Sequence, residues 1–65
     1  MNHNNLNGIC PADLIDAFDL NFNKGNVVKY VCRAGRKDPT TTVEDLKKAR
    51  EYLDREIHRI ESQEV

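Results

Sequence analysis

The residues best suited to chemistry in this chain are the basic ones of KGNVVKYVCRAGRK, residues 24–37. On a helix, Asn26, Lys29, Arg33 and Arg36 recur at i, i+3, i+7 and i+10, so they share one face, with Tyr30 at its edge. Guanidinium forks match phosphate oxygens, an ammonium is a compact charge, an amide can pair with a base or sugar edge, and a phenol ring can stack. The stretch therefore predicts a site for a phosphate-bearing nucleotide, with these ligand-binding residues: Asn26, Lys29, Tyr30, Arg33, Arg36 and Lys37.

The same basic face has a second interpretation, which the sequence leaves open. Like charges one helical turn apart destabilise a helix slightly, so they need a counter-charge. That charge could come from the acids of the following segment, in which case the face is an ordinary salt-bridge seam between helices or subunits. The acids concerned are Glu44, Asp45, Glu51 and Asp54.

The distribution of charge limits the class of partner. Residues 1–23 carry −3, residues 24–37 carry +5 and residues 38–65 carry −3, which gives the net charge of −1. A nucleic-acid duplex would meet the acidic flanks as well as the basic centre, so broad nucleic-acid binding is not expected. A compact anion fits better.

Length and composition predict one small cytoplasmic domain that needs help to be stable. A chain of 65 residues buries only about 60% of its unfolded surface, and this one has two Phe, two Tyr and no Trp. Its two cysteines match neither a disulfide framework nor a zinc site, so we expect no metal, no cofactor and reduced thiols. No apolar run approaches the roughly 20 residues of a membrane span. Self-association is the expected source of additional stability.

The apolar pattern predicts an all-α domain of three helices: a short helix over 11–18, a basic helix from an N-cap at Asn23 to residue 33 or 34, and a long C-terminal helix of about 20 residues. Thr41 and Glu44 resemble a capping box at the start of the long helix. We expect a flexible segment over residues 1–8, a single domain over 9–62 and a tail over 63–65. Leu20 and Phe22 are expected to anchor the first connector in the core.

Two further patterns concern packing. Val27, Val28, Val31, Cys32 and Ala34 or Gly35 are predicted to face the core, and Gly35 is expected to adopt a left-handed conformation at the helix end. Leu46, Ala49, Leu53, Ile57 and Ile60 form one apolar stripe, longer than the shorter helices can cover. The sequence therefore predicts a homo-oligomer, a dimer or larger, with contacts at or near Leu53, Ile57 and Ile60.

Motifs along most of the chain resemble a small phage domain family labelled as of unknown function. Its central motif is G-N-x-x-K-Y-x-x-R-A-x-x-K, which here is Gly25, Asn26, Lys29, Tyr30, Arg33, Ala34 and Lys37. The flanking motifs are matched by Pro11, Asp13, Ile15, Asp45, Leu46, Lys48, Ala49, Tyr52 and Leu53. A His-Tyr pair usually opens the domain. Here His3 fits the first position and Asn4 replaces the Tyr.

The resemblance implies phage origin and nucleotide binding, because a similar domain occurs within a podophage deoxynucleoside monophosphate kinase. His3 and Gly25 are possible additional ligand contacts. We expect a phage-encoded protein that sequesters a nucleotide or a nucleotide-derived defence signal, cyclic ones included, without turnover. A minimal nucleotide kinase and a regulator that binds a host protein are the alternatives. The kinase would need metal-binding carboxylates, and the chain has no G-x-x-x-x-G-K-[ST] loop.

Overall fold

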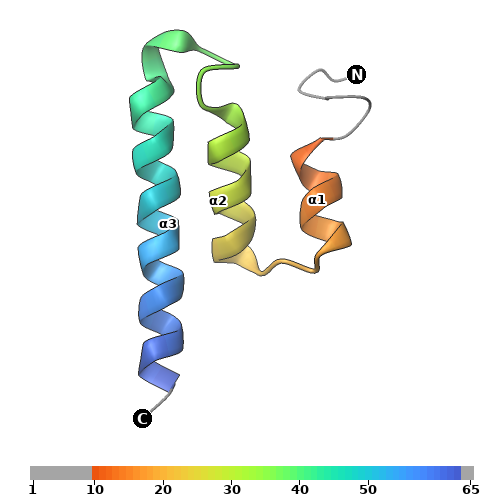
Figure 1. Ribbon diagram of the computed structural model, residues 1–65, viewed down its shortest axis with the longest axis vertical. Coiled ribbons are helices and arrows are strands. Elements are labelled where there is room, and N and C mark those ends of the chain that lie inside the picture. The colour runs from red at the N-terminus through yellow and green to blue at the C-terminus, as the bar shows by residue number, and fades with distance from the viewer. Residues whose placement is uncertain (1–9, 64–65) are drawn as a thin grey trace.

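The computed structural model describes residues 10–63 and confirms the all-α class with three helices. The helices are α1 (Pro11–Ala17), α2 (Phe22–Arg33) and α3 (Thr42–Gln63), with a 3-10 turn, η1 (Pro39–Thr41), before α3. They lie side by side in one layer, with α2 between α1 and α3 (Figure 1). The Cα atoms extend 44 × 28 × 11 Å, so the layer is one helix thick. The predicted segment 1–8 lies outside the described residues.

The short helix α1 begins after Cys10, the residue to which the Asp13 side chain is hydrogen-bonded. The Asp13 carboxylate accepts hydrogen bonds from the Cys10 backbone N–H at 3.1 Å and the Cys10 thiol at 3.4 Å. Pro11 occupies the first turn, where a missing N–H has no cost. Leu14 and Ile15 are half-buried, whereas Phe18, the last residue of the predicted helix, lies at the C-cap and is exposed. The apolar contact of α1 is therefore limited to about one turn.

The start of α2 differs from the prediction. Its N-cap is Asn21, whose Oδ1 accepts the Lys24 backbone N–H at 2.9 Å, and the helix already includes Asn23. Both asparagines are good caps, so the sequence alone could not choose between them. The earlier start also moves Phe22 into the helix, where its side chain is exposed, while Leu20 is half-buried as expected.

The connection from α2 to α3 confirms one prediction and corrects another. Gly35 has φ +80°, the left-handed conformation expected at the helix end. The predicted capping box of Thr41 and Glu44 is wrong, because the chain is already turning at Pro39. Asp38 is the cap: its carboxylate accepts the Thr40 N–H at 3.0 Å and the Thr40 hydroxyl at 2.8 Å. Pro39 occupies the first position of this turn, which runs directly into α3.

The side of α3 that faces α2 is different from the one its apolar stripe predicted. The row turned toward α2 contains Asp45, Ala49, Tyr52 and Glu56, and three of these, Asp45, Ala49 and Glu56, are buried. Of the predicted apolar stripe only Ala49 is buried; the exposed members are Leu46, Leu53, Ile57 and Ile60. Residues 10–63 therefore have almost no apolar core, and polar contacts join α2 to α3.

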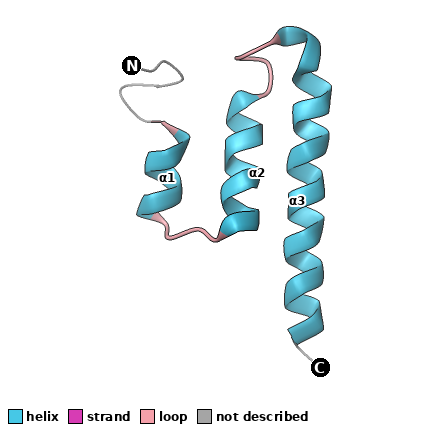
Figure 2. Ribbon diagram, turned by 180° about the vertical axis from the view of Figure 1, so that it is seen from behind, coloured by secondary structure: helices cyan, strands magenta, loops and turns pink. Residues whose placement is uncertain are grey.

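The two faces of the layer have opposite character. In a right-handed helix each residue turns the side chain by about 100°. In each of the two helices, one row of residues contacts the other helix. Because α2 and α3 are antiparallel (Figure 2), the residues that follow these contact residues in sequence lie on the same face of the layer in both helices. On α3 these following residues are Leu46, Arg50, Leu53 and Ile57, and on α2 they are Lys24 and Val31. One residue before the row lie Glu44, Lys48, Glu51 and Arg55 of α3, and Phe22 and Lys29 of α2.

The first of these faces is mostly apolar and exposed, with Val31 at 51% and Leu53 at 47% of full exposure. Val31 was predicted to face the core but is exposed, whereas Val27, Val28 and Cys32 are half-buried. Of the two alternatives for the helix end, Ala34 is half-buried and Gly35 is exposed. Within residues 10–63 no helix is both long and apolar enough to cross a membrane.

Candidate functional site

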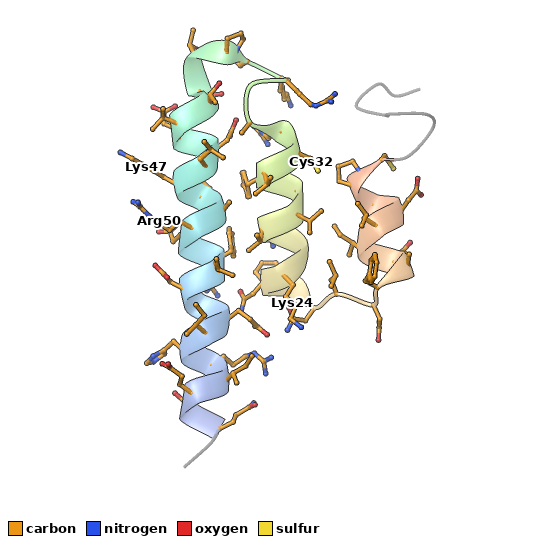
Figure 3. The ribbon with its side chains drawn as sticks, in the orientation of Figure 1. Lys24, Cys32, Lys47 and Arg50 are labelled. Carbon is orange, nitrogen blue, oxygen red and sulfur yellow. The ribbon has the colours of Figure 1, made fainter. Side chains whose placement is uncertain are left out.

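A small cationic groove lies between the start of α1 and the end of α2. It has a volume of about 170 Å³ and is lined by Pro11, Lys29, Cys32, Arg33 and Lys37. Cys32 points from α2 toward α1 (Figure 3), so the groove has an apolar floor beside three cations. None of the lining residues that the structure describes is acidic. Of the six residues predicted to bind the ligand, Lys29, Arg33 and Lys37 are brought together here.

Arg33 has one carboxylate neighbour, from α3. Its Nε lies 3.5 Å from Oδ1 of Asp45, which is itself 5% exposed. The two make no hydrogen bond, and Arg33 Nε is buried without a hydrogen-bond partner in the described residues. Asp45 also accepts the Thr41 hydroxyl at 3.3 Å. The salt-bridge interpretation is thus correct for this one residue, with loose geometry.

Lys29, Arg36 and Lys37 form no ion pair with any carboxylate of residues 10–63. The other acids predicted as counter-charges, Glu51 among them, lie on α3; Glu51 pairs with Lys48 at 3.7 Å. The basic helix therefore keeps most of its charge uncompensated within the part of the chain that the structure describes. An anion is the natural complement for such a surface.

Tyr30, which was predicted to stack on a base, packs on an aromatic ring of the same chain. Its ring stacks on Tyr52 of α3, with centroids 5.9 Å apart and planes at 10°. Lys29 Nζ and Arg33 Cζ each lie 5.6 Å from the Tyr30 centroid. Cations near a ring face are attracted by its quadrupole. Tyr30 therefore supports the two cations of the groove.

The other predicted site residues are placed less favourably. The Asn26 amide donates to the Phe22 carbonyl at 2.8 Å, so it is occupied by its own helix. Arg36 follows the end of α2, is exposed and does not line the groove. A Cβ built on Gly25 would lie 3.5 Å from the Ile15 side chain, which makes Gly25 a packing position between α1 and α2. His3 lies outside the described residues.

Sequence reasoning missed Glu56, whose side chain forms more hydrogen bonds than any other in residues 10–63. It is 4% exposed, and its two carboxylate oxygens accept four hydrogen bonds. Arg59 donates two of them, at 3.0 and 2.7 Å, Asn21 one at 2.9 Å and Asn23 one at 3.1 Å. The bonds from Arg59, then those from Asn21 and Asn23, lower the pKa of Glu56 to about 2. The bond to Glu56 also raises the pKa of Arg59.

The signal for this cluster was present in the sequence but weak. Asp45, Ala49, Tyr52 and Glu56 follow one another at spacings of 4, 3 and 4, as residues on one side of a helix do. That row contains two acids, so an apolar stripe beside it appeared the better candidate for the core. Nothing local to Glu56 indicates that Asn21 and Asn23, more than 30 residues earlier, will reach it.

Two other hollows lie outside the groove. One, of about 480 Å³, runs along the outer side of α3 between residues 44 and 54; because all its lining residues belong to one helix, it is an open surface. The second, of about 450 Å³, is lined by Asn21, Phe22, Asn23 and Arg59 beside the Glu56 cluster. Within residues 10–63 no group of three His, Cys, Asp or Glu could hold a metal ion.

Comparison with known proteins identifies the family of the chain. No curated protein matches the chain, and no solved structure does. A family model described as a protein of unknown function, DUF3310, matches residues 2–54. This match includes the central motif of the basic helix, the cationic groove and the first half of α3. The chain therefore belongs to the DUF3310 family.

Proposed function

We propose that the chain binds a nucleotide or nucleotide-derived signal, linear or cyclic, by its phosphate group in the groove between α1 and α2. The observation that carries this proposal is the grouping of Lys29, Arg33 and Lys37 around one hollow, to whose lining the described part of the chain contributes no acid. Arg33 is held beside this hollow by Asp45 and the Tyr30 ring. A phosphate group would accept charge-assisted hydrogen bonds from all three cations.

The size of the groove sets how much of the ligand it can take. Pockets that enclose small molecules usually measure about 300–1,000 Å³, whereas this groove measures about 170 Å³. It is therefore suited to a phosphate group, and the sugar and base would lie along the surface outside it. Selectivity for phosphate should then exceed selectivity for the base.

The groove lining supports binding without turnover. Among residues 10–63 it is lined by no carboxylate and no histidine, the groups that most often act as general bases. The resemblance to a phage domain makes a host defence signal the class of nucleotide that we propose is sequestered. Incubation with a bound nucleotide followed by mass analysis should return it unchanged; a phosphorylated or hydrolysed product would contradict sequestration.

The test of binding compares nucleotides with the corresponding nucleosides, which lack the phosphate group. Calorimetry with nucleoside monophosphates, nucleoside diphosphates and cyclic dinucleotides, each against the matching nucleoside, should detect binding of at least one phosphate-bearing compound and of no nucleoside. Lys29→Ala and Lys37→Ala should each weaken that binding by roughly tenfold, since a hydrogen bond to a charged group contributes about 1.5–3 kcal/mol.

The matched control is Lys48→Ala, which removes one positive charge from α3 outside the groove. It should leave the affinity within about twofold, because a surface charge acts on a distant ligand only through a screened field. Equal weakening by all three variants would mean a general charge effect and no groove site. Equal binding of nucleoside and nucleotide would also overturn the proposal.

A further inference from the structure

The uncovered side of α3 carries a regular seam. Val43, Leu46, Leu53, Ile57 and Ile60 are all exposed. With Arg50 they occupy positions 43, 46, 50, 53, 57 and 60, at spacings of 3, 4, 3, 4 and 3. This is the alternation by which one helix packs along another in a coiled coil. We call these six residues the α3 seam.

The seam is bordered differently on its two sides. On one side Ala49 and Glu56 are buried against α2. On the other side lie Lys47, Asp54 and Glu61, all exposed. Lys47, like Arg50 of the seam itself, extends from α3 away from α2 (Figure 3). The uncovered surface is thus an apolar strip with charges along its free edge, as at a helix–helix interface.

We propose that the α3 seam binds a second copy of this chain, with the two α3 helices antiparallel. The spacing of the seam reads the same in both directions, so an antiparallel partner can match every position. Residue numbers that face each other then add up to 103: Val43 lies opposite Ile60 of the second copy, Leu46 opposite Ile57, and Arg50 opposite Leu53. A two-fold axis passes between positions 51 and 52, as closed dimers require.

Charge complementarity favours this arrangement. When two identical helices pack antiparallel, the residues on the free edge of one seam lie beside the residues on the free edge of the other. Lys47 then lies between Asp54 and Glu61 of the second copy, and Arg50, opposite Leu53, lies next to that same Asp54. Arg50 in the seam and Lys47 at its edge therefore both meet acids at the edge of the other α3, and the two-fold axis repeats each pair.

A parallel dimer is disfavoured by the same residues. Identical positions would face each other, so Arg50 would lie against Arg50 of the second copy inside an apolar strip. Burying like charges together is costly because each loses water without gaining a partner. The seam therefore specifies direction as well as contact.

The rest of the layer is compatible with this dimer. Val31 of α2 lies on the same face of the layer as the seam, so α2 would pack on α2 of the second copy and form a four-helix arrangement. Lys29 lies on the opposite face, one residue before the contact row. The cationic groove would remain open on each outer side of the dimer, and the dimer is independent of what the groove binds.

The first test addresses register and direction. Leu46→Cys and Ile57→Cys are made separately in a chain that also carries Cys10→Ser and Cys32→Ser. The two variants are mixed unfolded, refolded together and then oxidised. The expected product is a covalent dimer that contains one copy of each variant. Covalent dimers of Leu46→Cys with itself would overturn the antiparallel arrangement, and the absence of any covalent dimer would overturn the interface.

The second test uses charges that are exposed in the single chain, so folding is not at risk. Arg50→Glu and Asp54→Arg should each raise the dimer dissociation constant by roughly tenfold or more in sedimentation, since the two-fold axis doubles each loss. The combined variant restores opposite charges and should regain most of the affinity. The control is Lys48→Glu with Glu51→Lys, a swap on the other face, which should leave the dissociation constant unchanged. A folded monomer of the parent chain at tens of micromolar would overturn the proposal.

Discussion

Asn21 and Glu56 are joined by a hydrogen bond of 2.9 Å between the Asn21 amide and Oε2 of the carboxylate, across 35 positions of sequence. The same asparagine caps α2 through its Oδ1. One side chain thus fixes the start of the basic helix and attaches it to the second half of α3. Because residues 10–63 have almost no apolar core, this polar contact contributes stability that apolar packing provides in larger domains.

Glu56 should make the unfolding free energy depend on pH in acid. Its pKa is about 2 in the folded chain, below the ordinary value of 4.5. Below 4.5 the unfolded chain therefore binds a proton that the folded chain does not, and stability falls as the pH drops from about 4.5 to about 2. Above 4.5 the contribution is complete and constant. Chemical denaturation at fixed protein concentration, repeated between pH 2 and pH 7, measures this slope.

Glu56→Gln should remove most of that slope and lower stability at neutral pH, because an amide cannot accept from all four donors. The matched control is Asp16→Asn, an exposed carboxylate on α1, which should leave the slope of the parent chain nearly unchanged. If Glu56→Gln keeps the full acid dependence, the Glu56 cluster does not link the two helices as described.

Substitutions at Asn21 should separate its two roles. Asn21→Ser keeps a good capping oxygen but loses the bond to Glu56, whereas Asn21→Ala loses both. The difference between the two variants should be about 1 kcal/mol, the usual value of an N-cap. Asn21→Asp keeps the cap but places a carboxylate against Glu56, so at pH 7 it should be less stable than Asn21→Ser. Thermal unfolding of the three variants gives this order, and an Asp variant as stable as the parent would contradict the contact.

Gly25 and Gly35 should respond to alanine in opposite ways. A Cβ at Gly25 would lie 3.5 Å from Ile15, an ordinary contact, so Gly25→Ala should gain about 0.5–1 kcal/mol from helix propensity. Gly35 has φ +80°, so Gly35→Ala should lose about 1 kcal/mol through backbone strain. Denaturation midpoints report both. A destabilised Gly25→Ala would contradict the spacing of α1 and α2 at this position.

The number and order of helices could be predicted from sequence because local signals define them. Pro11 and Pro39 mark starts, Gly35 marks an end, and the spacing of apolar residues along 42–63 fits only a long helix. The exact caps were harder, since Asn21 and Asn23 are equally good by type, as are Asp38 and Thr41. In each case the earlier residue is the cap, because the chain begins to turn there.

The packing of the helices could not be predicted, for a physical reason. Sequence reasoning assigned the first part of the apolar stripe of α3 to neighbouring helices of the same chain, and its end, at or near Leu53 and Ile57, to another subunit. The structure instead turns Asp45 and Glu56 toward α2. Acids are buried this way only when neighbouring groups compensate them. Thr41 and Arg59 lie close to these acids in sequence, but the ion-pair partner Arg33 and the donor Asn21 come from the other helix and its cap. The groove was predicted only in part: Lys29 and Arg33 share α2, but Lys37 and Pro11 join them only in the fold.

Arg33 and Asp45 provide the test that distinguishes the two interpretations of the basic helix. Arg33→Ala removes a groove cation and also leaves the buried Asp45 carboxylate with only the Thr41 hydroxyl. It should therefore lower both phosphate affinity and stability, the latter by on the order of 1 kcal/mol, because Arg33 is partly exposed and the pair is screened. Asp45→Asn in the same chain removes the stranded charge.

The double variant Arg33→Ala with Asp45→Asn should recover most of the stability but none of the phosphate binding. Asp45→Asn alone should keep or increase phosphate affinity, because it frees the guanidinium from its one carboxylate neighbour among residues 10–63. Arg33→Lys keeps the charge but not the planar fork, so it should preserve stability better than affinity. Melting temperature and calorimetric affinity, measured on all four variants, decide between the functions. If stability alone changes and no variant or parent binds a phosphate-bearing ligand, Arg33 is a structural ion-pair partner and the groove is not a nucleotide site.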